Sequence, residues 1–277
     1  MSTKSIEQKV KAFEDIHDIV NAMKAYAGLN IRKTEECVPH VRIYERNVSY
    51  AMAYLFAHFP SLAMPERHAG KRIIVAFGSE QGLCGAYNER IADYMDTVVN
   101  PEDYIFVIGK RLKSAIEQHK LRITAFMESA VSFDGIREVM ETSLSKIMDI
   151  YSQKDIYNLT VLFTSVIKNN ADIAMEQILP PDMEALETLE PLSKKCLMYL
   201  NPEQIFKKLI EEKLYISIYK CYVESLRSEN WYRLRSMESA SENIIKNISD
   251  LKTVQRYVRQ EDITQEILEI LGGSRLI

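Results

Sequence analysis

Proline and glycine are absent from most of two long stretches of this sequence. Neither occurs between residues 203 and 271, and the stretch 5–59 contains only Gly28 and Pro39. Nearly all the others lie between Pro60 and Pro202. As one helix, the stretch 203–271 would be about 100 Å long, whereas helices in globular proteins average only a few turns. This distribution predicts two long helices that flank a turn-rich middle.

Other features are scarce as well, and each scarcity excludes a class of protein. The four cysteines, Cys37, Cys84, Cys196 and Cys221, form no CxxC pair, which argues against a zinc site and a disulfide framework. No run of about 18 apolar residues exists, so we expect no direct membrane insertion. The first residues lack the apolar core of a signal peptide. A net charge of −4 argues against nucleic acid as a partner.

Mainly apolar residues, with a few polar interruptions, recur with a seven-residue period in both long stretches. In each stretch they form a seam, a stripe along one side of the predicted helix. In the C-terminal stretch the two interleaved series are Met237, Ile244, Leu251, Val258 and Leu234, Ser241, Ile248, Gln255. In the N-terminal stretch the series is Ile6, Val10, Phe13, His17, Val20, Lys24, Ala27, Ile31, Thr34, Val38, Val41. This period predicts a left-handed supercoil. The helices could belong to a larger bundle, but such narrow seams favour an antiparallel coiled coil of the two.

Pro39 interrupts the N-terminal pattern. Proline lacks the backbone N–H that an interior helical position donates, and its ring crowds the preceding turn. We therefore expect a kink or a break at Pro39, with helix resuming from Tyr44 to Phe59.

The middle of the chain has the pattern of an α/β domain. Short β-branched and apolar runs at 72–77, 104–108, 122–126 and 159–167 predict strands, and amphipathic runs at 88–98, 110–119 and 133–152 predict helices. Their alternation predicts a mostly parallel, Rossmann-like sheet, followed by edge strands or loop over 176–200. The predicted domains are an N-terminal shaft helix (1–60), an inserted α/β domain (70–202) and a C-terminal shaft helix (203–277).

One glycine-rich segment, FGSEQGLCGAYN at 77–88, follows the first predicted strand and precedes a helix. It could cradle a phosphate, but it lacks both the Walker A ending and the GxGxxG spacing. Cys84 would need a nearby base to act as a nucleophile, and none of the five histidines has such a context. We therefore interpret Gly82, Cys84 and Gly85 as a structural loop and predict no catalytic residue.

The remaining polar residues give no further site. Histidines, cysteines and carboxylates do not cluster in the sequence, so we expect neither a metal nor a cofactor. The charges along 203–235 are mixed in sign, which predicts a solvated helix face. Trp231 and Tyr232 are interpreted as packing residues because no basic groove accompanies them.

Three segments together resemble the gamma subunit of F-type ATP synthases. They are IVNAMKAYAGLNIRK at 19–33, SEQGLCGAYN at 79–88, and the segment 228–273 with SEN, MESASEN and RQEDITQEILEILGG. Their order and spacing agree with the family over essentially the whole chain. Glu80 stands where the family usually has aspartate, and the first two segments are more similar to the divergent alternative branch of bacterial F-type ATPases.

The resemblance implies a rotor shaft with no catalytic activity of its own. Its implied partners are the alpha and beta subunits that surround it, the epsilon subunit and the membrane c-ring. The implied location is peripheral, on the cytoplasmic face of the inner membrane, where ion transport is coupled to ATP synthesis. Residue matching implies beta-subunit contacts for Met23, Arg32, Lys33, Arg259, Gln260, Thr264 and Glu266.

Two other functions stay open at this point. The chain could be a coiled-coil adaptor outside any ATPase, which would not need the ending at 259–266. It could also be a small α/β enzyme that uses the loop at 78–85, in which case Cys84 should be essential.

Overall fold

The computed structural model describes residues 3–62, 71–153, 156–167, 170–182, 185–186, 188–189 and 197–273. The chain forms two compact units. The helix-pair unit consists of Met1–Gly28 with Arg233–Ile277, and the sheet unit is Leu29–Tyr232. Two helices run through both: α1 (Thr3–His58) and α6 (Pro202–Gly273).

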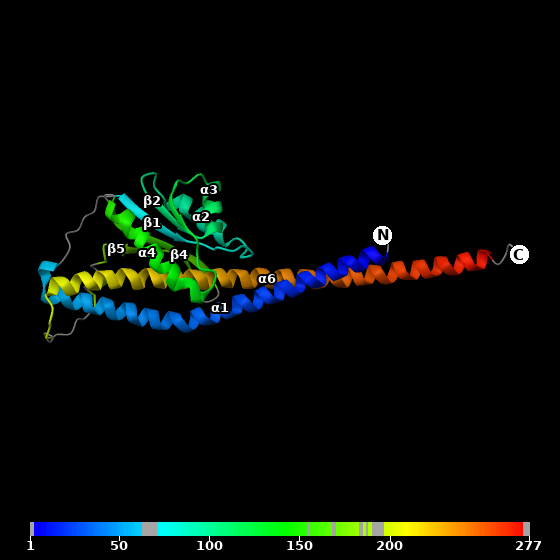
Figure 1. Ribbon diagram of the computed structural model, residues 1–277, viewed down its shortest axis with the longest axis horizontal. Helices are drawn as coiled ribbons and strands as arrows, with labels where there is room; N and C mark the ends of the chain where they lie inside the picture. Colours follow the sequence, from blue (N-terminus) through cyan, green and yellow to red (C-terminus); the bar gives the residue numbers. More distant parts are fainter. Residues whose placement is uncertain are drawn as a thin grey trace. The chain divides into compact units, whose positions relative to one another are not determined.

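In the helix-pair unit, α1 and α6 lie side by side in opposite directions (Figure 1). Thr3 Oγ1 lies 2.9 Å from Asp262 Oδ2, and Glu14 Oε1 lies 2.8 Å from Lys252 Nζ. Farther along α1, His17 Nε2 lies 3.2 Å from Ser241 Oγ. Residue numbers rise on one helix as they fall on the other, so the predicted antiparallel pairing is correct.

Predicted seam residues form the apolar cluster of this unit, together with Met23 and Ala240, which the predicted series did not include. Val20, Met237 and Ile244 are buried together, with Phe13, Met23, Ala240 and Ile248 packed around them. The polar positions in the seam have partners: Ser241 meets His17, and Gln255 Nε2 lies 3.1 Å from Glu7 Oε1. The seven-residue period therefore places these side chains correctly.

Of the kink or break predicted at Pro39, the break is wrong, and the kink stays a prediction. Helix α1 continues without interruption from Thr3 to His58 with Pro39 inside it. Pro39 lies on the exposed side, while Val38 and Val41 on either side of it are buried. The packing of these neighbours compensates for the one backbone hydrogen bond that proline removes.

The sheet unit contains five strands: β1 (Lys71–Phe77), β2 (Tyr104–Ile108), β3 (Ile123–Met127), β4 (Ile156–Ile167) and β5 (Asn170–Leu179). Their order is β3-β2-β1-β4-β5. The first four are parallel, and β5 pairs antiparallel with β4 as an edge strand. The parallel sheet is as predicted, but the edge strand begins earlier than the expected 176–200, part of which lies outside the described residues.

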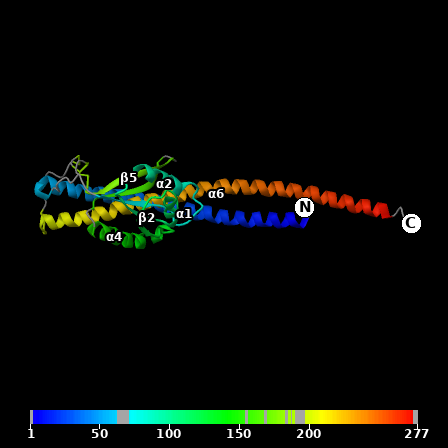
Figure 2. The same cartoon turned by 90° about the horizontal axis from the view of Figure 1, so that it is seen from above.

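Helices cover both faces of this sheet. Helices α2 (Tyr87–Val98) and α3 (Lys110–Gln118) pack on Ile74, Ala76, Ile105 and Val107. Helices α4 (Ile136–Gln153) and α6 pack on the alternate residues Ile73, Val75, Phe106 and Val161. Figure 2 shows α2 and α4 on opposite sides of β2. Short 3-10 turns at Pro60–Leu62 and Phe133–Gly135 complete the fold.

The continuous apolar runs of β1 and β2 follow from this arrangement. A parallel strand with both faces covered has no exposed side to alternate with. In the sheet unit, α6 therefore takes the place of one of the covering helices of a Rossmann-like layer.

Candidate functional site

The glycine-rich loop after β1 is closed by its own side chains. The backbone N–H of Ser79 donates to Asn88 Oδ1 at 3.0 Å, and Asn88 Nδ2 donates back to Ser79 Oγ at 2.8 Å. Cys84 is only 2% exposed, and its Sγ lies 3.4 Å from Ser79 Oγ. Gly85 has a φ of +57°, which favours glycine. A thiol enclosed in this way has little access to a substrate.

Glu80 occupies the position that an anionic ligand would need. Its Oε2 accepts hydrogen bonds from the backbone N–H of Lys110 at 3.1 Å and of Ser129 at 2.8 Å. Lys110 is the first residue of α3, where exposed N–H groups attract negative charge. The loop thus supplies its own carboxylate at a helix N-terminus that could otherwise hold a phosphate.

A close approach between two strand ends was missed by the sequence reasoning. A Cβ on Gly109 would lie 2.5 Å from the carbonyl oxygen of Gly78, and Gly109 has a φ of +115°. A Cβ on Gly78 would lie 2.1 Å from Leu112 Cβ. Both positions therefore exclude side chains. The available signal was a glycine directly after each of two predicted strands.

Helix α6 fills the crevice at the carboxyl ends of the strands. In open parallel sheets, ligands bind at this edge where the strand order reverses, which here is between β1 and β4. Ser228 Oγ donates to the Thr164 carbonyl at 2.7 Å, and Ser225 Oγ lies 2.7 Å from the hydroxyl of buried Tyr87. The Tyr222 hydroxyl lies 3.0 Å from Ser129 Oγ after β3. Protein side chains thus occupy the usual ligand position.

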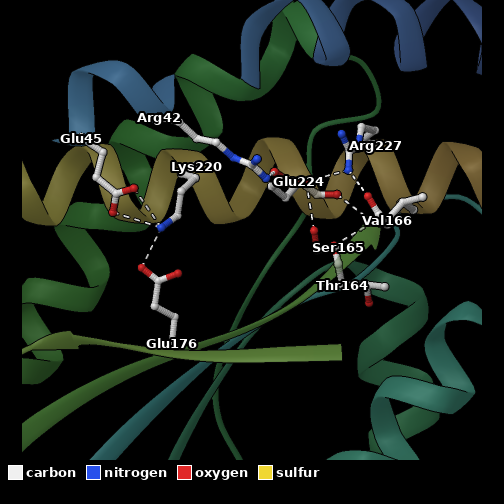
Figure 3. Close-up of polar contacts among 10 residues, drawn as sticks. Arg42, Glu45, Thr164, Ser165, Val166, Glu176, Lys220, Glu224 and Arg227 are labelled. Atoms are coloured by element: carbon white, nitrogen blue, oxygen red, sulfur yellow. Dashed lines mark hydrogen bonds and ion pairs between the residues drawn. The ribbon is translucent and has the colours of Figure 1, made fainter. Parts of the chain in front are cut away.

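A charge network joins α1, α6 and the sheet, and we call it the buried charge network because its α6 side chains are largely covered. It comprises Arg42, Glu45, Glu176, Lys213, Lys220, Glu224 and Arg227, and Figure 3 labels all of them except Lys213. Arg42 is its most exposed member, at 58%. At one end, the Glu224 side chain is only 2% exposed. It lies 2.6 Å from Arg42 NH2, 3.1 Å from Arg227 NH2 and 3.2 Å from Ser165 Oγ. Arg227 also donates to the carbonyl of Val166.

At the other end of the network, Glu45 of α1 meets two lysines of α6. Its carboxylate lies 2.9 Å from Lys213 Nζ and 3.0 Å from Lys220 Nζ. Lys220 Nζ also lies 2.7 Å from Glu176 of β5. Burial alone would raise the pKa of Glu45, but the Lys220 and Lys213 ammonium groups outweigh it and hold the pKa below its ordinary value. Burial lowers the pKa of Lys220, but Glu176 and Glu45 raise it overall.

This network corrects the expectation of a solvated helix face along 203–235. Lys207 and Lys208 are exposed as expected. Lys213 and Arg227 are instead largely covered within ion pairs, and Arg233 is buried. A helix sequence with charges of both signs does not show whether its side chains face water or form ion pairs with residues on neighbouring strands and helices. The interpretation of Tyr232 as a packing residue is correct, since its ring lies 5.5 Å from that of Tyr87.

The residues matched to family contacts occupy different environments. Met23 packs at the edge of the Val20 cluster. The Arg32 side chain is 79% exposed, and its Nε lies 3.2 Å from Glu36 Oε1 one turn away. Lys33 Nζ lies 2.6 Å from Asp134 Oδ2, beside the start of α4.

The C-terminal part of α6 presents its side chains to solvent. Arg259, Gln260, Thr264 and Glu266 are all exposed, and Thr264 Oγ1 donates to the Gln260 carbonyl at 2.7 Å. Ile263, Ile267, Leu268 and Ile270 are exposed on the same segment. Several large apolar side chains exposed together mark a surface that a partner covers.

Among the described residues, no three His, Cys, Asp or Glu side chains are grouped so as to hold a metal ion. No helix within the described parts is long and apolar enough to cross a membrane. Cys196 lies outside the described residues.

These features define a class of protein: an α/β module inserted between two long helices that pair antiparallel. A family model described as ATP synthase matches residues 2–275, and the chain belongs to that family. With the gamma-chain relatives described next, this confirms the resemblance to the gamma subunit, and the similarity to the divergent bacterial branch stays a prediction.

Curated relatives match over their full length. The ATP synthase gamma chain of Malacoplasma penetrans is 27% identical, with 99% of each chain covered. That of Lachnoclostridium phytofermentans is 26% identical, with 100% of this chain and 99% of the relative covered.

Solved structures share the fold. A chain of the Euglena gracilis mitochondrial ATP synthase OSCP/F1/c-ring structure has a TM-score of 0.70 and 17% identity, over 99% of this chain and 93% of that one. A chain of the Tetrahymena thermophila central stalk and c-ring structure has a TM-score of 0.60 and 16% identity, over 80% and 99%.

Proposed function

We propose that this chain is the gamma subunit of an F-type ATP synthase and serves as its central rotor shaft. The observation that carries this proposal is the family match from residue 2 to residue 275 on a fold shared with central-stalk chains. Rotation of the shaft couples ion flow to the conformations of the catalytic subunits. A paired, hydrogen-bonded helix is stiff enough to transmit torque.

The partners follow from the assemblies in which the related chains are found. Those structures contain F1, the c-ring and the central stalk. The chain accordingly contacts the alpha and beta subunits, the epsilon subunit and the c-ring, and is peripheral on the cytoplasmic face of the inner membrane. The division into shaft helices 1–60 and 203–277 with a foot domain at 70–202 is part of this proposal.

The chain itself is not catalytic in this proposal. Glu80 and the side chains of α6 occupy the positions where a phosphate or another ligand would bind to such a sheet. Gly82, Cys84 and Gly85 act as a structural loop that closes on Ser79 and Asn88. The nucleotide belongs to the beta subunits, and this chain needs no cofactor.

The contacts with beta are assigned to exposed, long polar side chains. Arg259, Gln260, Thr264 and Glu266 lie on the exposed part of α6 and can form charge-assisted hydrogen bonds that break and re-form at each step. Arg32, Lys33 and Met23 form the second contact region, on α1. The apolar residues near Glu266 add area to the first of these contacts.

The first experiment is an affinity purification of the tagged chain from host membranes, with ATP hydrolysis measured in the eluate. Recovery of alpha, beta and epsilon subunits with ATPase activity is expected. Recovery of the chain alone would favour a coiled-coil adaptor. Activity of the chain alone that is lost in a Cys84→Ala variant would favour an enzyme and contradict the proposal.

A pair of variants on one helix tests the beta contacts. Arg259→Ala should reduce ATP hydrolysis by the purified complex without changing the yield of the chain. Arg256→Ala removes another exposed arginine one turn earlier and serves as the matched control. Equal activities of the two variants would remove Arg259 from the proposed contact.

A further inference from the structure

The buried charge network lies where α6 meets both α1 and the sheet. Lys220, Glu224 and Arg227 are spaced by four and three residues, so they lie on one face of α6. Lys220 contacts Glu45 of α1 and Glu176 of β5. Glu224 contacts Arg42 of α1 and Ser165 of β4. Each of these two α6 residues thus joins the other helix and a strand at the same time (Figure 3).

The apolar core around this network cannot fix the position of α6 by itself. Leu214, Ile218 and Tyr222 of α6 pack on the sheet and hold it close. Apolar burial is non-directional, so it opposes separation of two surfaces more than sliding or turning of one along the other. Charge-assisted hydrogen bonds depend on distance and angle and therefore oppose such displacements.

Stability alone explains the network poorly. Buried ion pairs often contribute less to stability than well-packed apolar residues of similar volume. This chain nevertheless places seven charged side chains in one interface, with bonds of 2.6–3.2 Å directed to three other elements. In some proteins such groups specify one register between surfaces that could otherwise pack in several, and we infer that role for this network.

We propose that Lys220 and Glu224, held by Glu45, Arg42, Glu176 and Ser165, form the joint that transmits torque between the sheet and the two shaft helices. This inference rests on the proposed rotor function, and it names the residues that carry torque between the sheet and the helices. They are positioning residues: they contact neither nucleotide nor the transported ion. Ser228 and Tyr222 also bond α6 to the sheet side, but neither of these bonds reaches α1. Without the joint, the two shaft helices and the sheet can therefore shift against one another under load.

The test uses the whole complex in liposomes with the tagged chain. ATP hydrolysis and the ATP-driven membrane potential are measured on the same sample, the latter with a voltage-sensitive dye that works for any transported ion. The variants are Glu224→Gln and Glu176→Gln. The control is Glu141→Gln, which removes the charge from an exposed pair with Arg137 on α4.

For Glu224→Gln we expect hydrolysis close to that of the wild type, while the ratio of potential generation to hydrolysis falls at least about five-fold. Glu176→Gln should lower the ratio less, because it removes one link only, and Glu141→Gln should leave it unchanged. A merely structural residue would lower both activities together. Unchanged ratios in both test variants would overturn the inference.

Two outcomes separate this inference from the proposed function. If the Glu224→Gln complex does not assemble, the test rests on Glu176→Gln, whose side chain is partly exposed. An unchanged ratio of potential generation to hydrolysis in that variant overturns the joint, and a lowered ratio supports it. If the wild-type complex generates no potential from ATP, the proposed function fails, and the joint fails with it.

Discussion

The same helix, α6, is used in two different ways by the two units. In the helix-pair unit its buried side chains near the seam include Met237, Ser241 and Ile244, and the charged residues around them are exposed. In the sheet unit it buries a nearly continuous polar series: Glu224, Ser225, Ser228, Glu229 and Asn230. Both segments of α6 are helical, so the difference in which side chains they bury comes from the surface that each segment packs against.

A second helix offers α6 a narrow apolar stripe, whereas a sheet offers fixed carbonyl and hydroxyl groups at its strand ends. Ser228 can therefore be buried because the Thr164 carbonyl accepts the hydrogen bond that its hydroxyl donates. The helix-pair unit has few such partners, and His17 with Ser241 is its example inside the seam. We infer that directional bonds determine register in the sheet unit and that side-chain shape determines it in the helix-pair unit.

The largest expected effect is in the sheet unit, at Gly109. Gly109→Ala forces a Cβ against the Gly78 carbonyl at a positive φ and should destabilise the full chain by about 3 kcal/mol. Urea unfolding measures the loss, and hydrogen exchange should locate it in β1, β2 and α3. Gly28→Ala is the control, because a Cβ there meets nothing within 4 Å. Equal effects of the two variants would contradict the proposed close approach.

The next effect concerns Glu45. Glu45→Gln leaves Lys213 without its carboxylate and should cost up to about 3 kcal/mol at neutral pH. Because the folded pKa of Glu45 is lowered, its contribution is present above the ordinary value of 4.5 and is lost as the pH falls through the folded value. The stability difference between wild type and variant should therefore shrink on acidification below pH 4.5. A constant difference from pH 7 to pH 3 would contradict the ion-pair assignment.

A smaller effect is expected from the apolar seam. Met237 is 3% exposed, but few other apolar side chains surround it. Met237→Ala should therefore lower the free energy of unfolding by about 2 kcal/mol, the low end for a core methionine. Hydrogen exchange should accelerate over 237–248 and stay unchanged in β1 and β4. The matched control is Tyr257→Ala on the same helix, a side chain that is 66% exposed. Loss of protection in the sheet after Met237→Ala would show that the two units do not respond separately.

The sequence allows the architecture to be predicted because its signals are local. The absence of glycine and proline, the seven-residue period and the alternation of β-branched and amphipathic runs each arise within one element. The buried network could not be predicted in this way. Glu224 and Arg42 are paired by tertiary packing, and a charged helix face has the same pattern whether its partners are water molecules or strands. Pro39 is a related case, since the burial of Val38 and Val41 outweighs its local propensity.

The smallest predicted effect has the opposite sign. His17 and Ser241 are a polar pair inside the seam, and their Nε2 and Oγ atoms lie 3.2 Å apart. Replacing both, as His17→Leu with Ser241→Ala, removes the two seam groups together and adds apolar surface to the seam; the Asn21 amide, which also contacts His17, is exposed and can bond to water. The gain should be about 1 kcal/mol, measured by urea unfolding of the full chain. Ser241→Ala alone removes only the hydroxyl and should instead destabilise slightly, because His17 then loses that partner. If the double variant were also less stable, the polar pair would set the register of the helix-pair unit, and directional bonds would govern both units of the molecule.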